Sequence, residues 1–292
     1  MIGSVRYEIE HVTAYRYRSP VRRCVMSLCL QPREDCGQRL LRFEATTAPA
    51  APLTSERDCF GNTKHVLNIH RDHEALAITT RSTVEVAPPA PLLRSLGTDA
   101  WEEIRSWREA FVHWDFTHAS ALARPSSALT AFMEREDMKA EGDPLEALLR
   151  LSDTLYRSFR YVPGSTSVGS PMEHILESGS GVCQDYAHVM IAIARSWGVP
   201  ARYVSGYLHV GGRSGTPGPQ TAMHAWVECR LPDLDWIGFD PTNQSVADER
   251  YVRVAVGRDY HDVPPTRGVL QGGEGSKLEV GVRVRPSLSP DR

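Results

Sequence analysis

The sequence predicts an α+β protein, in which an N-terminal antiparallel, β-sandwich-like domain precedes a second domain with helices packed on an antiparallel sheet. Two observations indicate this class. Apolar and polar residues alternate over much of residues 3–87, whereas the apolar period is about 3.6 residues in several segments after residue 97. Between them lies a proline-dense stretch, residues 87–91, which cannot continue a sheet ladder. The sequence therefore changes from strand to helix patterning at this stretch.

The first domain is expected to be built from strands. We assign residues 1–87 to this β domain, 88–97 to a proline-rich linker, 98–286 to the second domain and 287–292 to a tail. Alternation places Cys24, Met26 and Leu28 on one buried face. The strands predicted in the first domain cover residues 5–9, 22–30, 39–46, 64–69 and 75–86.

The second domain begins with helices. Helices are predicted over residues 98–112 and 127–138, and a third is expected to start at Pro144 with Asp143 as its N-cap. In the first of these helices one apolar side is formed by Trp101, Ile104, Trp107 and Phe111. Later strands are predicted over residues 202–210, 251–256 and 278–284, which we expect to complete the sheet of this domain, and a glycine-rich loop over residues 211–220.

A cysteine at the start of a helix is the first candidate for chemistry. Glycines precede Cys183, and from residue 185 to 197 the apolar residues fall at three- and four-residue steps. A helix N-terminus carries positive potential and unpaired N–H groups, which favour a thiolate. Cys183 is therefore a candidate nucleophile, with Asp185 expected to stabilise the start of the helix.

A hairpin supplies a candidate base and a group to orient it. Residues 221–229 and 236–240 are predicted strands joined by a turn that contains Pro232. The residue numbers place His224 opposite Asp240 to within about one residue of register, where an imidazole can reach a carboxylate. A lone cysteine, histidine or aspartate is more often structural, but nucleophile, base and orienting acid occur here together.

These segments together resemble the bacterial transglutaminase-like cysteine protease family. The Cys, His, Asp order matches, as do Gly-Val-Cys-Gln-Asp-Tyr-Ala around Cys183, His-Ala-Trp-Val-Glu from His224 and Phe-Asp-Pro-Thr-Asn around Asp240. Further matches are residues 198–207, 257–260 and 262–265. The first domain is similar to the β domain that precedes this core in bacterial members, at residues 11–17, 30–33 and 58–62. The resemblance implies a papain-like or transglutaminase-like core with Cys183, His224 and Asp240 as its catalytic triad.

The triad implies acyl transfer through a thioester. Hydrolysis of peptide or isopeptide bonds and amine transfer by a cross-linking transglutaminase use the same three residues. Because bacterial members are mostly hydrolases, the resemblance favours a cysteine peptidase or amidase. A noncatalytic peptide-binding module with the same fold is a third interpretation. The expected partner is a peptide or protein substrate, and the chemistry needs no metal or organic cofactor.

Composition narrows the remaining function classes. A net charge of −3 gives no general electrostatic argument for binding nucleic acid or an anionic membrane. No apolar run approaches the length of about 20 residues that spans a bilayer, and no signal peptide is evident, so we expect a cytoplasmic protein with its six cysteines reduced. His65, His70 and His73 match no metal-ligand spacing, and we expect no metal site there.

Overall fold

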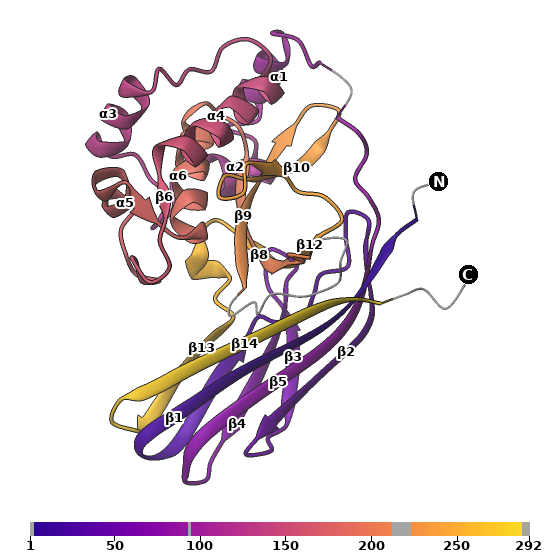
Figure 1. The fold of residues 1–292 in the computed structure, drawn as a ribbon, viewed down its shortest axis with the longest axis vertical. Coiled ribbons are helices and arrows are strands. Elements are labelled where there is room, and N and C mark those ends of the chain that lie inside the picture. The colour runs from indigo at the N-terminus through magenta and orange to yellow at the C-terminus, as the bar shows by residue number, and fades with distance from the viewer. Residues whose placement is uncertain (1–2, 93–94, 212–222, 288–292) are drawn as a thin grey trace.

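The computed structural model describes residues 3–92, 95–211 and 223–287, which form two lobes (Figure 1). Residues 212–220 of the predicted glycine-rich loop and 288–292 of the predicted tail lie outside the described residues. Within the described ranges, no helix is both long and apolar enough to cross a membrane.

One lobe is a curled antiparallel sheet of seven strands. Its central strand β1 pairs with β5 and β14 along its first part and with β4 and β13 along its second part. The predicted buried face is confirmed, because Cys24, Met26 and Leu28 are at most 4% exposed. The strands of this sheet are β1 (Val5–Leu28), β2 (Gln38–Ala48), β3 (Leu53–Arg57), β4 (Thr63–Ile69), β5 (His73–Val86), β13 (Thr266–Gly272) and β14 (Ser276–Ser287).

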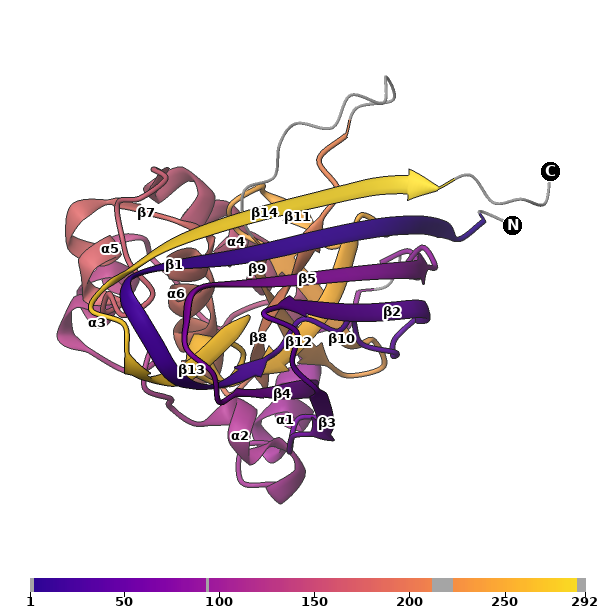
Figure 2. The same ribbon diagram turned by 90° about the horizontal axis from the view of Figure 1, so that it is seen from below.

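The last strand corrects one prediction. Residues 278–284 do form a strand, but they do not complete the sheet of the second domain; β14 pairs with β1 from Arg6 to Tyr17. Figures 1 and 2 both show this C-terminal strand beside the N-terminal one. Alternating polarity predicts which face of a strand is buried but not which strand lies beside it. The sheet lobe is therefore made from both ends of the chain.

The other lobe carries the helices. Asp143 caps α4 as predicted, accepting from the backbone N–H groups of Leu145 and Glu146. The first predicted helix is shorter than expected: α1 ends at Ser106, so Phe111 leaves the apolar side and is 96% exposed. The helices are α1 (Ala100–Ser106), η1 (Phe111–His113), α2 (Trp114–Thr117), α3 (Ser127–Arg135), α4 (Pro144–Ser158), α5 (Glu173–Ser178), α6 (Cys183–Ser196) and η2 (Tyr260–Asp262).

A five-stranded antiparallel sheet, in the order β11-β10-β9-β8-β12, supports the helices. Helix α6 packs on one face, where Ala225, Val227 and Cys229 of β9 are buried with it in the main core. The strands are β8 (Ala201–Leu208), β9 (His224–Leu231), β10 (Asp235–Asp240), β11 (Ser245–Val246) and β12 (Tyr251–Gly257), and a separate parallel bridge joins β6 (Arg160–Tyr161) to β7 (Ser180–Gly181). The second domain therefore contains helices packed on an antiparallel sheet, as predicted.

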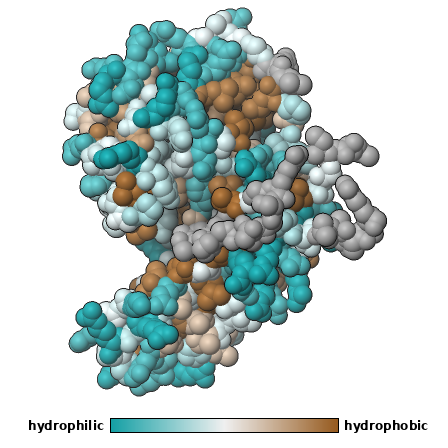
Figure 3. Space-filling model, in the orientation of Figure 1, coloured by the Kyte–Doolittle hydropathy of each residue, from teal (hydrophilic) through white to brown (hydrophobic). Residues whose placement is uncertain are grey.

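The other face of this sheet has its own small core and a cavity. Trp226 and Tyr251 pack there with Val204 and Val256. A cavity of about 750 Å³ lies between the proline-rich linker and the β9–β10 hairpin and is lined by both of these aromatic residues. Figure 3 shows hydrophobic residues gathered in this part of the upper lobe, on a face that is otherwise largely hydrophilic.

Candidate active site

Cys183 is the first residue of α6, as the sequence predicted. Asp185 accepts hydrogen bonds at Oδ2 from the Val182 N–H (2.8 Å) and from the Thr166 hydroxyl (2.6 Å), which ties the helix start to the preceding loop. Gly181 leaves space beside it, since a Cβ there would lie 2.6 Å from the Ile175 side chain and 3.0 Å from that of Asp185. The cysteine is therefore held on a packed helix end, and its side chain is only partly buried.

The predicted pairing of His224 with Asp240 exists, but its register differs from the expected one. His224 Nε2 lies 2.6 Å from Asp240 Oδ2. In β9 and β10, Trp236 pairs with Arg230 and Phe239 with Val227, so the residue numbers of partners sum to 466 and not to the expected 464 or 465. His224 and Asp240 are thus diagonal neighbours on one face, a separation that a long side chain can bridge.

Asp240 is fully buried and surrounded by donors. Its Oδ1 accepts from the Thr242 backbone N–H (3.0 Å) and hydroxyl. Its Oδ2 accepts from the Asn243 amide (2.7 Å) and the Tyr251 hydroxyl (2.9 Å), besides His224. Burial alone would raise the pKa of Asp240, but these hydrogen bonds and the charge of His224 hold it well below its usual range. The carboxylate is therefore ionised.

His224 connects this carboxylate to the cysteine. Burial by itself would lower the pKa of His224, but hydrogen bonds to Asp240 and to Cys183, with the negative charge on both, raise it to about 10. The imidazole is therefore charged near neutral pH. Because Nε2 faces Asp240, the other ring nitrogen, Nδ1, is left for the sulfur. The structure thus brings together the three residues that the sequence singled out.

Tyr161 is a further member of the site and lies beside Cys183. The β6–β7 bridge sets Tyr161 next to Gly181, and the Val162 N–H donates to the Gly181 carbonyl (2.9 Å). Burial, the charges of Cys183 and Asp240 and a hydrogen bond to Cys183 raise the pKa of Tyr161 to about 12. The phenol is therefore neutral beside the sulfur. A two-residue bridge gives no periodic pattern, and its position just before the cysteine loop is the only signal in the sequence that could have indicated this role.

Two further polar residues near Cys183 and His224 in the sequence, His188 and Glu228, are paired with residues outside the candidate triad. Glu228 forms ion pairs with Arg202 (2.6 Å) and Arg253 (3.4 Å). His188 is buried in α6, where burial lowers its pKa to about 4, and its Nε2 accepts from the Tyr260 N–H (3.3 Å). Among the described residues, no cluster of three or more His, Cys, Asp or Glu is arranged to hold a metal ion.

Comparison with known proteins identifies the family. The sequence profile of the Transglutaminase-like superfamily matches residues 133–241, and that of the bacterial transglutaminase-like N-terminal region matches residues 7–85. The uncharacterized protein Rv2569c of Mycobacterium tuberculosis is 34% identical, over 97% of this chain and 94% of its own. The chain belongs to the transglutaminase-like superfamily.

Other proteins match this chain to different extents. A crystal structure from Cytophaga hutchinsonii, described as a "Putative Cysteine Protease", has a TM-score of 0.77 at 18% identity and covers 99% of this chain and 93% of that one, which shows the shared fold. A protein-glutamine gamma-glutamyltransferase of Pseudomonas aeruginosa is 38% identical over 93 residues, which are 30% of this chain and 14% of that protein. The transglutaminase-like core and its N-terminal β domain are thus both present.

Proposed function

We propose that this protein is a cysteine peptidase or amidase that hydrolyses peptide or isopeptide bonds through a thioester on Cys183. One observation carries the proposal: His224 lies 2.6 Å from Asp240 on one side, and on the other it is close enough to Cys183 for the sulfur to raise its pKa. Nucleophile, base and orienting acid are thereby linked in the order that acyl transfer requires. Cys183 and His224 are both partly exposed, so a substrate can reach them.

The first half of the reaction forms the acyl enzyme. The Cys183 thiolate attacks the carbonyl carbon and the carbonyl oxygen becomes negatively charged. The backbone N–H of Cys183, at the N-terminus of α6, and the neutral hydroxyl of Tyr161 beside the sulfur are the candidate donors to this oxyanion. As the carbon–nitrogen bond breaks, the His224 imidazolium gives its proton to the leaving amine.

The second half releases the acyl group. Neutral His224 takes a proton from water, and the hydroxide attacks the thioester carbon. The carbon–sulfur bond breaks, which yields a carboxylic acid and regenerates the thiolate beside the imidazolium. Asp240 stays ionised throughout, because five hydrogen bonds from its surroundings stabilise its charge. It fixes the imidazole ring in one orientation in both steps.

A substrate-independent experiment tests the nucleophile. Cys36 and Cys59 are exposed free cysteines and serve as internal controls. At pH 6, where an unperturbed thiol is mostly protonated, we expect iodoacetamide to label Cys183 much faster than either control, and His224→Ala to remove this selectivity. Mass spectrometry of the labelled peptides measures the rates. Equal labelling of the three cysteines in the folded wild-type protein would contradict the proposal and favour a noncatalytic peptide-binding module.

Amine transfer is the second candidate, favoured by the local 38% identity to the Pseudomonas glutamyltransferase. Incubation with glutamine-containing peptides and a labelled primary amine separates the two activities. Peptide fragments or free carboxylic acid products, lost in Cys183→Ala, indicate hydrolysis. Stable incorporation of the amine, lost in the same variant, would replace hydrolysis with transfer and leave the role of Cys183 unchanged.

A further inference from the structure

Tyr251 contacts the proposed triad from the buried side. Its hydroxyl donates to Asp240 Oδ2 (2.9 Å), the same oxygen that faces His224 Nε2, and its other neighbour is the Ser245 hydroxyl (2.8 Å). Tyr251 is 4% exposed and begins β12, whereas Asp240 ends β10. Strands β9 and β8 lie between β10 and β12 in the sheet, so this side chain connects strands that do not pair.

The direction of these hydrogen bonds follows from charge. Burial, and after it the negative charge of Asp240, raise the pKa of Tyr251 well above its usual value, so the phenol keeps its proton. That single proton goes to Asp240, whose ionised oxygens can only accept. Ser245 must then donate to the Tyr251 oxygen. The result is a directed chain from Ser245 through Tyr251 to the carboxylate.

Aromatic packing restricts the Tyr251 ring. Trp226 meets it edge-on, with ring centroids 5.3 Å apart and planes at 72°, and Trp226 also lies nearly parallel to His224 at 6.3 Å. Gly206 makes room for this arrangement, because a Cβ there would be 2.5 Å from the Trp226 ring. The phenol oxygen is therefore presented to Asp240 from a packed support.

We propose that Tyr251 is a positioning residue for the thiol chemistry: by holding Oδ2 of Asp240, it holds the imidazole that the carboxylate orients. This inference rests on the proposed function and extends it to a residue about ten positions beyond Asp240. Tyr251 acts through Asp240 and does not touch the sulfur in this account. Removal of the Tyr251 hydroxyl should therefore slow the reaction of Cys183 only in a protein that contains Asp240.

A double-mutant cycle tests this dependence. The rate measured is iodoacetamide labelling of Cys183 at pH 6. Tyr251→Phe keeps the ring and removes only the hydroxyl, and we expect labelling to slow about 10-fold, the size of effect of one lost hydrogen bond to a charged group. In an Asp240→Ala background the same Phe substitution should change the rate by less than about 2-fold.

Tyr207→Phe is the matched control. Tyr207 is also a fully buried tyrosine, but its hydroxyl bonds to His11 (3.0 Å) and not to the triad. We expect this variant to lose stability and to keep the wild-type labelling rate. A wild-type rate in folded Tyr251→Phe, or the same slowing with and without Asp240, would overturn the role of Tyr251 while the proposed function stood. Unselective labelling of the wild-type protein would overturn both.

Discussion

His224 lies between two groups that favour its charged form. Hydrogen bonds to Asp240 and Cys183 outweigh burial and raise its pKa to about 10. In the unfolded chain a histidine has a pKa of about 6.5. A raised pKa stabilises the folded state fully below the unfolded value, and this contribution is lost as the pH rises through the folded value. The depressed pKa of Asp240 acts in the opposite direction, with stability lost as the pH falls below about 4.

The pH dependence of unfolding tests this residue-scale account. We expect the difference in the free energy of unfolding between wild type and His224→Gln to be largest near pH 6. It should shrink by on the order of 2 kcal/mol by pH 10, because only the wild-type histidine loses its charge there. Urea denaturation at a series of pH values measures the difference. A difference independent of pH over this range would show that His224 is not charged in the folded protein.

At the scale of elements, the β9–β10 hairpin depends on two glycines beside Trp226. A Cβ on Gly206 would lie 2.2 Å from the Val252 carbonyl oxygen, and one on Gly238 would lie 2.5 Å from the Ala247 side chain. Trp226 fills the space above them and contacts both His224 and Tyr251. The lack of a side chain at Gly206 and at Gly238, on the strands beside Trp226, therefore helps to position His224.

Gly206→Ala should disturb both stability and the site. The backbone oxygen of Val252 cannot move away as a flexible side chain could. We therefore expect the free energy of unfolding to fall by about 1–3 kcal/mol, which is typical of overpacking. Displacement of Trp226 should also slow the labelling of Cys183. The control is Gly281→Ala in β14, where a Cβ meets nothing within 4 Å. Equal stability of the two variants in urea denaturation would contradict the packing argument.

Local sequence patterns predicted where these elements lie in the chain more accurately than they predicted which segments contact each element in the fold. Helical spacing and the glycine-rich approach predicted α6 with Cys183 in its first turn. The hairpin was predicted with its register off by one or two, because Asp233 and Asp235 adopt left-handed conformations (φ 60° and 58°) that no periodicity reveals. Tyr161 and Tyr251 reach the site from β6 and β12, which carry no other residue of the site, and such contacts depend on tertiary packing, not on a local period.

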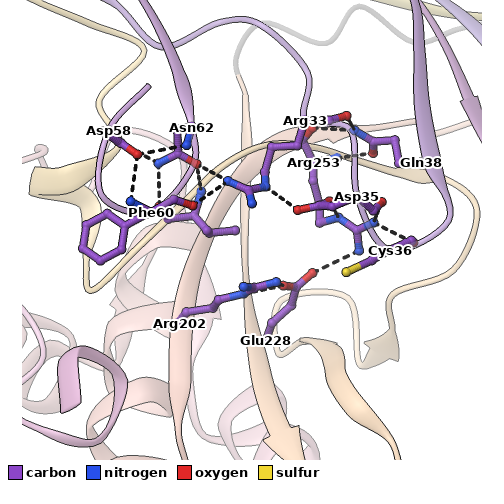
Figure 4. A network of polar contacts seen from close by, with 11 residues as sticks. Arg33, Asp35, Cys36, Gln38, Asp58, Phe60, Asn62, Arg202, Glu228 and Arg253 are labelled. Carbon is purple, nitrogen blue, oxygen red and sulfur yellow. Dashed lines mark hydrogen bonds and ion pairs between the residues drawn. The ribbon is translucent and has the colours of Figure 1, made fainter. Parts of the chain in front are cut away.

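At the scale of the molecule, the two lobes share a core and are linked by polar contacts. Tyr7 and Val282 of the sheet lobe are buried in the same cluster as residues of α6. Figure 4 shows the polar link, in which loops of the sheet lobe meet the outer edge of the other sheet. There Arg253 of β12 forms an ion pair with Asp35 (3.2 Å), and its backbone N–H donates to the side-chain oxygen of Gln38 (2.8 Å).

Asn62 extends this link by acting as a strand partner. Its side-chain amide donates to the Val256 carbonyl (2.8 Å) and accepts from the Val256 N–H (2.9 Å), as a neighbouring strand would. Arg33 donates to the same amide oxygen (2.6 Å). The motif around residues 58–62, which resembles the family's β domain, thus completes the edge of the sheet that carries His224. The β domain supports the candidate site from outside it.

Asn62→Ala therefore tests whether the lobes fold as one unit. The substitution leaves the buried N–H and carbonyl of Val256 without their Asn62 partner, so we expect the free energy of unfolding to fall by about 2–3 kcal/mol. The control is Asn68→Ala at an exposed position, for which we expect almost no change. All six tryptophans lie in the range from residue 101 to residue 236, so tryptophan fluorescence, excited selectively against tyrosine, reports the helical lobe alone. A lower urea midpoint by fluorescence, from a substitution in the sheet lobe, indicates coupled unfolding. An unchanged fluorescence midpoint, with an altered circular dichroism transition, would mean that the lobes unfold separately and that the site does not need its β domain.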